Sequence, residues 1–75
     1  MHNNIRIGQL WRSNDPRNAR TVKITRILNY VTGHVRNHVV NPQDKVHVEN
    51  VMTRKTSVIR ANNFTSGTRG WSREG

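Results

Sequence analysis

The apolar residues near the start of the chain recur at every second position. In the segment IRIGQLW, the side chains of Ile5, Ile7 and Trp11 share the odd positions, and Gln9 lies between them. A period of two places alternate side chains on one face of a strand, whereas a helix needs a period of 3.6. The pattern therefore predicts a half-buried strand from residue 5 to residue 11.

The segment TVKITRIL continues the alternation and then breaks it. Val22 and Ile24 fall on one face and Lys23 on the other, but the phase slips at Ile27 and Leu28. A one-residue slip of this kind is typical of a β-bulge or of the end of a strand.

Further strands are predicted in the second half of the chain. VHVENVM alternates through Val46 and Val48, and RKTSVIR ends in a strand at Val58 and Ile59. The segment 30–40 is rich in β-branched residues, which favour strands, and Gly33 is a candidate turn within it. Residues 41–45, NPQDK, have the composition of a loop.

Taken together, these segments predict five or six short antiparallel strands in a small all-β barrel. No window of the chain sustains a helical period, and closing a small sheet limits exposed strand edges. We expect one domain over residues 5–72, between mobile residues 1–4 and 73–75. The predicted core comprises Ile7, Leu10 or Trp11, Val22, Ile24, Val48, Val58, Ile59, Phe64 and Trp71.

Charge adds a functional constraint to this fold. The 75 residues carry 13 basic and four acidic side chains, a formal net charge of +9. Residues 1–26 contribute +5, residues 27–52 contribute zero and residues 53–75 contribute +4. A basic face built from both ends of the chain predicts an anionic partner, although a merely solubilising surface remains an alternative. On residues alone, nucleic acid and an acidic protein surface are equally good partners.

The sequence offers no catalytic or cofactor-binding pattern. The carboxylates of Asp15, Asp44, Glu49 and Glu74 are not placed as an acid–base pair, and no nucleophile elbow or Gly-rich phosphate loop occurs. The chain has no cysteine, which removes disulfides and thiolate zinc sites from consideration. We therefore expect a protein that is not an enzyme and that has no cofactor.

Histidines are the remaining candidate metal ligands. His34 and His38 are four residues apart, and His47 follows. On a strand, residues i and i+4 share a face but lie about 13 Å apart, too far to bind one ion. We expect no metal site. Neither a membrane span nor a signal peptide is recognisable, so we expect an intracellular protein.

Aromatic side chains give only a weak nucleic-acid signal. Trp11, Phe64 and Trp71 fit core positions, which leaves Tyr30 for the surface, and no RRM, KH, helix-turn-helix or zinc-finger pattern occurs. In the stretch NDPR, Asn14, Asp15 and Pro16 suit a corner between two strands. The charge of the nearby arginines is not needed for that corner.

Two stretches, IGQLWRSNDPRNARTVKI and TSVIRANNFTSGTRGW, resemble a group of small phage-encoded proteins. Their pattern runs G-Q-x-W, N-D-P-R, a basic turn into R-T-x-x-V/I, and finally a Phe-containing turn and T-S-x-G-Y. Trp71 stands where the group usually has tyrosine, the tail is slightly longer, and residues 29–52 match no part of the pattern. The matching positions are Gly8, Gln9, Trp11, Asn14, Asp15, Pro16, Arg17, Arg20, Thr21, Phe64, Thr65, Ser66, Gly70 and Trp71.

This resemblance implies an SH3-like barrel. It also implies an early transcription regulator of a lytic phage, acting as a monomer in the cytoplasm of the host bacterium. Such a regulator binds host RNA polymerase near the start of the largest subunit, inhibits sigma-dependent initiation at host promoters and promotes antitermination. Contact with nascent RNA or DNA is also implied, and the alternative is a small basic barrel that acts directly on DNA or RNA.

The expected partner-binding residues are basic side chains on or beside the basic face. Charge reversal at two of them is expected to weaken binding and leave the fold intact. They are Arg6, Arg12, Arg17, Arg20, Arg54, Lys55 and Arg60.

Overall fold

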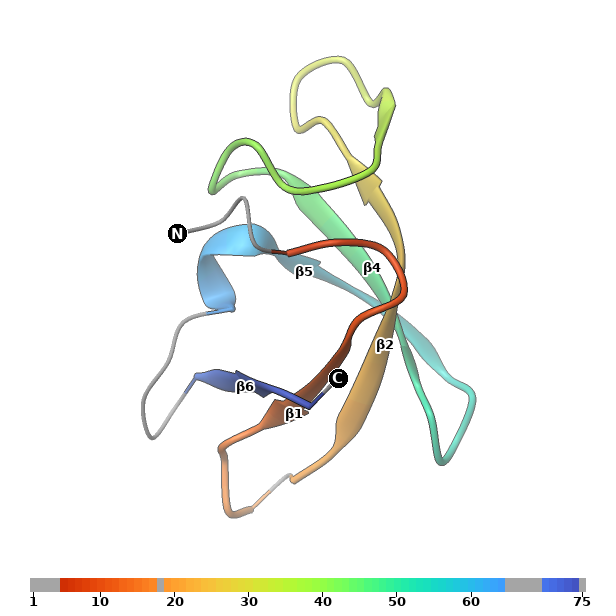
Figure 1. Ribbon diagram of the computed structural model, residues 1–75, viewed down its shortest axis with the longest axis vertical. Coiled ribbons are helices and arrows are strands. Elements are labelled where there is room, and N and C mark those ends of the chain that lie inside the picture. Colours follow the sequence, from red (N-terminus) through yellow and green to blue (C-terminus); the bar gives the residue numbers. More distant parts are fainter. Residues whose placement is uncertain (1–4, 18, 65–69, 75) are drawn as a thin grey trace.

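The computed structural model describes residues 5–17, 19–64 and 70–74. These residues form one antiparallel sheet in the order β5-β4-β2-β1-β6, with β3 also paired to β2 (Figure 1). This part of the chain contains a 3-10 turn but no α-helix, which confirms the all-β prediction. The elements are β1 (Leu10–Ser13), β2 (Thr21–Leu28), β3 (Val35–Arg36), β4 (Lys45–Asn50), β5 (Thr56–Arg60), the 3-10 turn η2 (Ala61–Asn63) and β6 (Trp71–Arg73). Among the described residues, no helical segment has the length and the apolar composition that a membrane-spanning helix requires.

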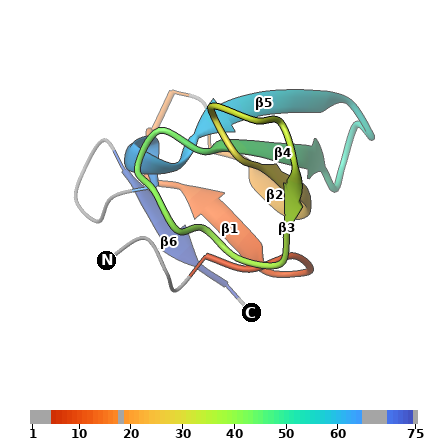
Figure 2. The same cartoon turned by 90° about the horizontal axis from the view of Figure 1, so that it is seen from above.

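The sheet curls around a small core, as the view from above shows (Figure 2). Strands from both ends of the sheet order contribute to this core, together with η2 and the segments that precede β1 and β4. No backbone ladder joins the two outer strands, β5 and β6, in the described residues. The core residues are Ile5, Trp11, Val22, Ile24, Ile27, Val39, Val46, Val48, Ala61, Phe64 and Trp71, with Ile59 packed against them.

Three aromatic rings occupy one side of this core. The Trp11 and Phe64 rings meet edge to face at 5.4 Å between centroids, and Phe64 lies 5.3 Å from Trp71. Edge-to-face and tilted pairs of this kind stabilise a core beyond the area they bury. The predicted burial of all three aromatic side chains is confirmed.

A bulge divides β2. Its register against β4 shifts between Ile24 and Arg26, and the Thr25 hydroxyl donates to the carbonyl of His47 (3.2 Å). The extra residue lets both Ile24 and Ile27 face the core, while Arg26 points to the other side of the sheet. The irregularity predicted near Ile27 is therefore a bulge, and the strand runs on to Leu28.

Two predicted core residues are exposed instead. Ile7 is 42% exposed because Gly8, at φ 92°, turns the chain and breaks the alternation before β1 begins. Val58 is 55% exposed because Ile59 faces the core, so that its neighbour on edge strand β5 faces outward. Of Leu10 and Trp11, the tryptophan is the buried one.

The segment 30–40, whose β-branched composition favours strands, contains only one short strand, and the candidate turn at Gly33 is confirmed. Only Val35–Arg36 pair with β2. The side-chain oxygen of Asn29 accepts the N–H groups of Val31 and Thr32, and Gly33 has φ 76°, so the backbone turns here and the strand is limited to the residues that follow.

Both ends of the expected domain can be placed in part. The boundary expected after residue 72 falls inside β6, since Arg73 pairs with Trp11 and the Glu74 N–H donates to the Leu10 carbonyl (2.7 Å). Residues 1–4 and 75, which the sequence predicts to be mobile, lie outside the described residues.

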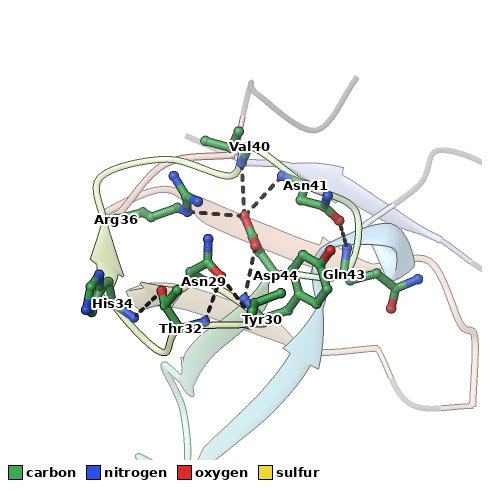
Figure 3. A network of polar contacts seen from close by, with 10 residues as sticks. Asn29, Tyr30, Thr32, His34, Arg36, Val40, Asn41, Gln43 and Asp44 are labelled. Carbon is green, nitrogen blue, oxygen red and sulfur yellow. Dashed lines mark hydrogen bonds and ion pairs between the residues drawn. The ribbon is translucent and has the colours of Figure 1, made fainter.

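A buried carboxylate holds the loop that follows β2 (Figure 3). Asp44 has no exposed surface, and its Oδ1 accepts the Tyr30 N–H at 3.3 Å. Its Oδ2 accepts the N–H groups of Val40 (3.1 Å) and Asn41 (3.0 Å) and lies 3.8 Å from Arg36 Nε. A carboxylate that receives several backbone donors replaces the hydration it loses on burial. Asp44 thereby fixes the irregular segment against β4.

Candidate anion-binding surface

The outer face of the sheet gathers basic side chains from four strands. Strand alternation turns Val22, Ile24, Val46 and Val48 inward, so the residues between them face outward. We call this surface the basic sheet face. It comprises Arg12 of β1, Lys23 and Arg26 of β2, Lys45 of β4 and Arg60 of β5, all of which are exposed.

Cross-strand pairing brings like charges together on this face. Lys45 lies directly opposite Arg60, a geometry that places Cβ atoms about 5 Å apart and is unfavourable for like charges. Arg60 Nη1 donates to the amide oxygen of Gln43 (3.0 Å) rather than to a carboxylate. An anion bound across Lys45 and Arg60 would relieve this repulsion.

A single carboxylate faces outward among the paired residues of β4. Glu49 lies opposite Lys23, but its Oε2 accepts a hydrogen bond from Arg54 Nη1 at 3.1 Å. The side chains of Lys23, Arg26 and Lys45 make no hydrogen bond or ion pair within the described part of the chain. The basic sheet face is therefore strongly cationic and largely uncompensated.

The structure distributes the seven predicted partner-binding residues over several surfaces. Arg12 and Arg60 lie on the basic sheet face. Arg6 pairs with His38 in an isolated bridge, Arg17 follows the corner after β1, and Arg54 occupies the β4–β5 turn with φ 66°. These three arginines belong to loops and are not brought together on one sheet face.

Arg20 and Lys55 form a separate pair. Both line a hollow of about 260 Å³ at the end of the sheet where β2 begins and β4 ends. The Arg20 guanidinium also lies 5.3 Å from the centre of the Trp71 ring, a cation–π distance. The two residues, 35 positions apart in sequence, are brought together by the β2–β4 pairing.

Three residues of the basic sheet face were missing from the sequence prediction: Lys23, Arg26 and Lys45. The sequence predicts that Lys23 faces away from Val22 and Ile24, but its neighbours on the adjacent strands cannot be known without the register. Arg26 joins the same face only because of the bulge at Thr25.

The G-Q-x-W residues have structural roles. Gly8 adopts φ 92°, and a Cβ there would meet no atom within 4 Å, so the position is constrained by backbone conformation and not by space. The Oε1 atom of the buried Gln9 accepts both the Trp11 indole N–H (3.0 Å) and the Arg6 backbone N–H (3.0 Å). The motif thereby satisfies the one polar group of a core tryptophan.

The N-D-P-R corner is built in the same way. Asp15 Oδ1 accepts the Arg17 N–H at 2.9 Å, which closes a turn around Pro16. Asn14 connects the corner to β6, because its side-chain oxygen accepts the Ser72 hydroxyl (2.9 Å) and its N–H donates to Gly70. These contacts agree with the architectural interpretation of the corner.

The histidines are dispersed. His34 lies in the β2–β3 loop, His38 in the bridge to Arg6, and His47 on the outer side of β4 between Arg26 and Val58. Within residues 5–17, 19–64 and 70–74, no three His, Asp or Glu side chains cluster as metal ligands would.

Neither a known family model nor a curated protein nor a solved structure matches the chain.

Proposed function

We propose that this protein is a phage-encoded transcription regulator that binds host bacterial RNA polymerase. In this proposal it inhibits sigma-dependent initiation and promotes antitermination, and it docks through the basic sheet face. The observation that carries the proposal is the gathering of five exposed cations on one face, where Glu49, the carboxylate among them, already binds Arg54.

The physical properties of the surface suit a docking module. Uncompensated positive charge accelerates encounter with an acidic protein surface and disfavours wrong orientations. A sheet held by strand ladders keeps its charged side chains in fixed relative positions, so less conformational freedom is lost on binding. Competition with sigma then requires only that the docked domain overlap or distort a surface that sigma uses.

The choice of RNA polymerase as the partner is supported by the sequence resemblance. The G-Q-x-W and N-D-P-R stretches are similar to those of small phage proteins, including the early regulator of a lytic Xanthomonas phage. The same positive charge near the path of nascent RNA favours continued elongation. We infer no catalytic step, and none of the described side chains is assigned to one.

The experiment is affinity capture of polymerase from nuclease-treated bacterial lysate on the immobilised protein. The wild type is expected to retain polymerase subunits, and K23E/K45E is expected to lose most of that retention. R6E/R17E makes the same change in net charge at two residues that the sequence also predicted to bind the partner but that lie in loops, so in this proposal it serves as the matched control. Equal retention by the two double variants would contradict docking through the basic sheet face, and no retention by the wild type would contradict the polymerase proposal.

Direct binding of DNA or RNA is a second candidate. It is favoured by the cross-strand pairing of Lys45 with Arg60, because two adjacent cations can bind the same phosphate group. It predicts that capture vanishes after nuclease treatment. It also predicts that purified duplex DNA binds with an affinity that falls steeply with salt, with a slope of about −0.9 per phosphate contacted.

A further inference from the structure

The Arg20–Lys55 hollow is distinct from the basic sheet face. It is lined by residues on the core side of β2, β4 and β5 and by the β4–β5 turn, whereas the basic sheet face lies on the opposite side of those strands. Val22 and Val48 provide its apolar lining. Two cations therefore border a partly apolar recess, an arrangement that the outer face does not offer.

The polar side chains of the hollow are mainly hydrogen-bond donors. Asn50 Oδ1 already accepts the N–H groups of Met52 (2.9 Å) and Thr53 (3.2 Å), so the group of this side chain that can bind a ligand is its NH₂ donor. Thr53 Oγ1 accepts the Lys55 N–H (3.3 Å) and keeps its hydroxyl proton to donate. With the guanidinium of Arg20 and the ammonium of Lys55, the free groups favour an anionic ligand.

We propose that this hollow binds an acidic side chain of a protein partner, an aspartate or glutamate followed by an apolar residue. The carboxylate is recognised by Arg20 and Lys55. The apolar neighbour contacts the tip of the β4–β5 turn, where Val51 and Met52 are 39% and 85% exposed. Exposed apolar side chains beside paired cations are complementary to a mixed acidic and apolar segment.

A protein segment fits these observations better than a single-stranded nucleic acid. Base-binding surfaces use exposed aromatic rings as stacking platforms. Trp71 is only 8% exposed and already lies against Arg20, whereas the exposed ring of Tyr30 follows the far end of β2. A volume of about 260 Å³ also lies just below the range for drug-sized ligands, which suits a side chain better than a whole nucleotide.

A second copy of this chain is a poor occupant. Each copy carries a net charge of +9. Of its four carboxylates, Asp44 is fully buried and Glu49 binds Arg54, which leaves Asp15 and Glu74 to offer to a neighbour. Repulsion between two such cationic domains opposes self-association.

The test is an NMR titration of the ¹⁵N-labelled protein with the blocked peptide acetyl-GSEELEGS-amide. We expect saturable shifts of the amides of Arg20 and of residues 51–55. K55Q is expected to weaken peptide binding about fivefold, the effect of losing one ion pair at a partly exposed site. K45Q removes the same charge from the basic sheet face and is expected to change the affinity less than about twofold.

R20K and the glutamine peptide acetyl-GSQQLQGS-amide complete the design. R20K retains the charge of Arg20 but loses the planar fork of donors, so it is expected to weaken binding of the acidic peptide while the spectrum stays that of a folded protein. The glutamine peptide is expected to produce no saturable shifts. Equal effects of K55Q and K45Q would overturn the proposal, because binding would then depend on net charge alone.

The oligonucleotide dT8 tests the alternative class of ligand. Suppose that dT8 shifts the same amides at lower concentration than the peptide does, and that K55Q weakens dT8 binding more than it weakens peptide binding. The hollow then binds a phosphate and the proposal is wrong. The inference rests on the proposed function only in taking a protein as the partner. Because the probe is a peptide, polymerase capture can fail while peptide binding at the hollow succeeds, and the two failures are distinguishable.

Discussion

Replacing Asp44 by asparagine tests whether one carboxylate holds the irregular segment between β2 and β4. The substitution conserves size but presents an NH₂ group in place of one oxygen. If the remaining oxygen takes the position of Oδ2, the bonds from Val40 and Asn41 survive as neutral ones and the Tyr30 N–H is left facing a donor. Attraction to Arg36 Nε, already 3.8 Å away, is also lost.

The cost follows from these contacts. A hydrogen bond to a charged group contributes about 1.5–3 kcal/mol, and a neutral one about half of that. One lost bond and two weakened ones amount to at least roughly 3 kcal/mol when each is taken at the low end of its range. Loss of the ion pair adds to this cost, because Asp44 is fully buried and the buried Arg36 Nε has no hydrogen-bond partner. A domain of 75 residues has a total stability of about 4–11 kcal/mol, so D44N removes a large fraction.

Urea unfolding followed by tryptophan fluorescence measures the effect. With a slope near the low end for small domains, about 1–1.5 kcal/mol per molar, the midpoint is expected to fall by roughly 2 M or more. D15N is the matched control, because Asp15 is exposed and asparagine can accept the same Arg17 N–H, so its midpoint is expected to remain that of the wild type. A loss below about 1 kcal/mol for D44N would refute the assigned role.

Four further substitutions test the packing, each by urea unfolding. Gln9→Ala leaves the Trp11 indole N–H without its buried acceptor and is expected to cost about 1–3 kcal/mol, with a red shift of tryptophan emission; an unchanged midpoint would contradict the bond. Gly8→Ala at φ 92° is expected to cost about 1–2 kcal/mol, since no clash adds to the backbone penalty, whereas a neutral result would mean that the turn adjusts. Val58→Thr is expected to be nearly neutral and Phe64→Ala to cost about 3–5 kcal/mol, and a reversed order would contradict the burial of these two side chains.

The parts of the fold that the sequence predicts correctly are those controlled by local alternation. Val22 and Ile24 are predicted as core because their strand alternates without interruption until the bulge. The predicted burial of Ile7 is wrong because the positive φ angle of Gly8 turns the backbone and ends the alternation. The predicted burial of Val58 is wrong because Val58 and Ile59 are adjacent apolar residues on a strand. They face opposite sides, and the sequence does not show which of the two faces the core.

The candidate site is harder to predict from the sequence than the core, because it depends on how the residues of neighbouring strands are aligned. Arg12 and Arg60 can be proposed from charge alone, but the opposition of Lys45 and Arg60 exists only once β4 and β5 are aligned. Likewise, the composition of residues 41–45 predicts a loop, which is correct up to Asp44 because β4 begins at Lys45, but nothing local shows that Asp44 is fully buried. Its burial depends on donors that come from residues 30–41.

Pairing of the first strand with the last one has a kinetic consequence. Trp11 is aligned with Arg73, and Ser13 with Trp71, so β1 lacks one of its two neighbours until segments about 60 residues apart have met. Contacts between segments so distant in sequence require a large loop to close before any stabilisation is gained, and domains dominated by such contacts fold in about milliseconds to seconds, slower than helical domains of the same size. The aromatic cluster, which needs both Trp11 and Trp71, is therefore expected to form late, and tryptophan fluorescence in a stopped-flow experiment reports its formation directly.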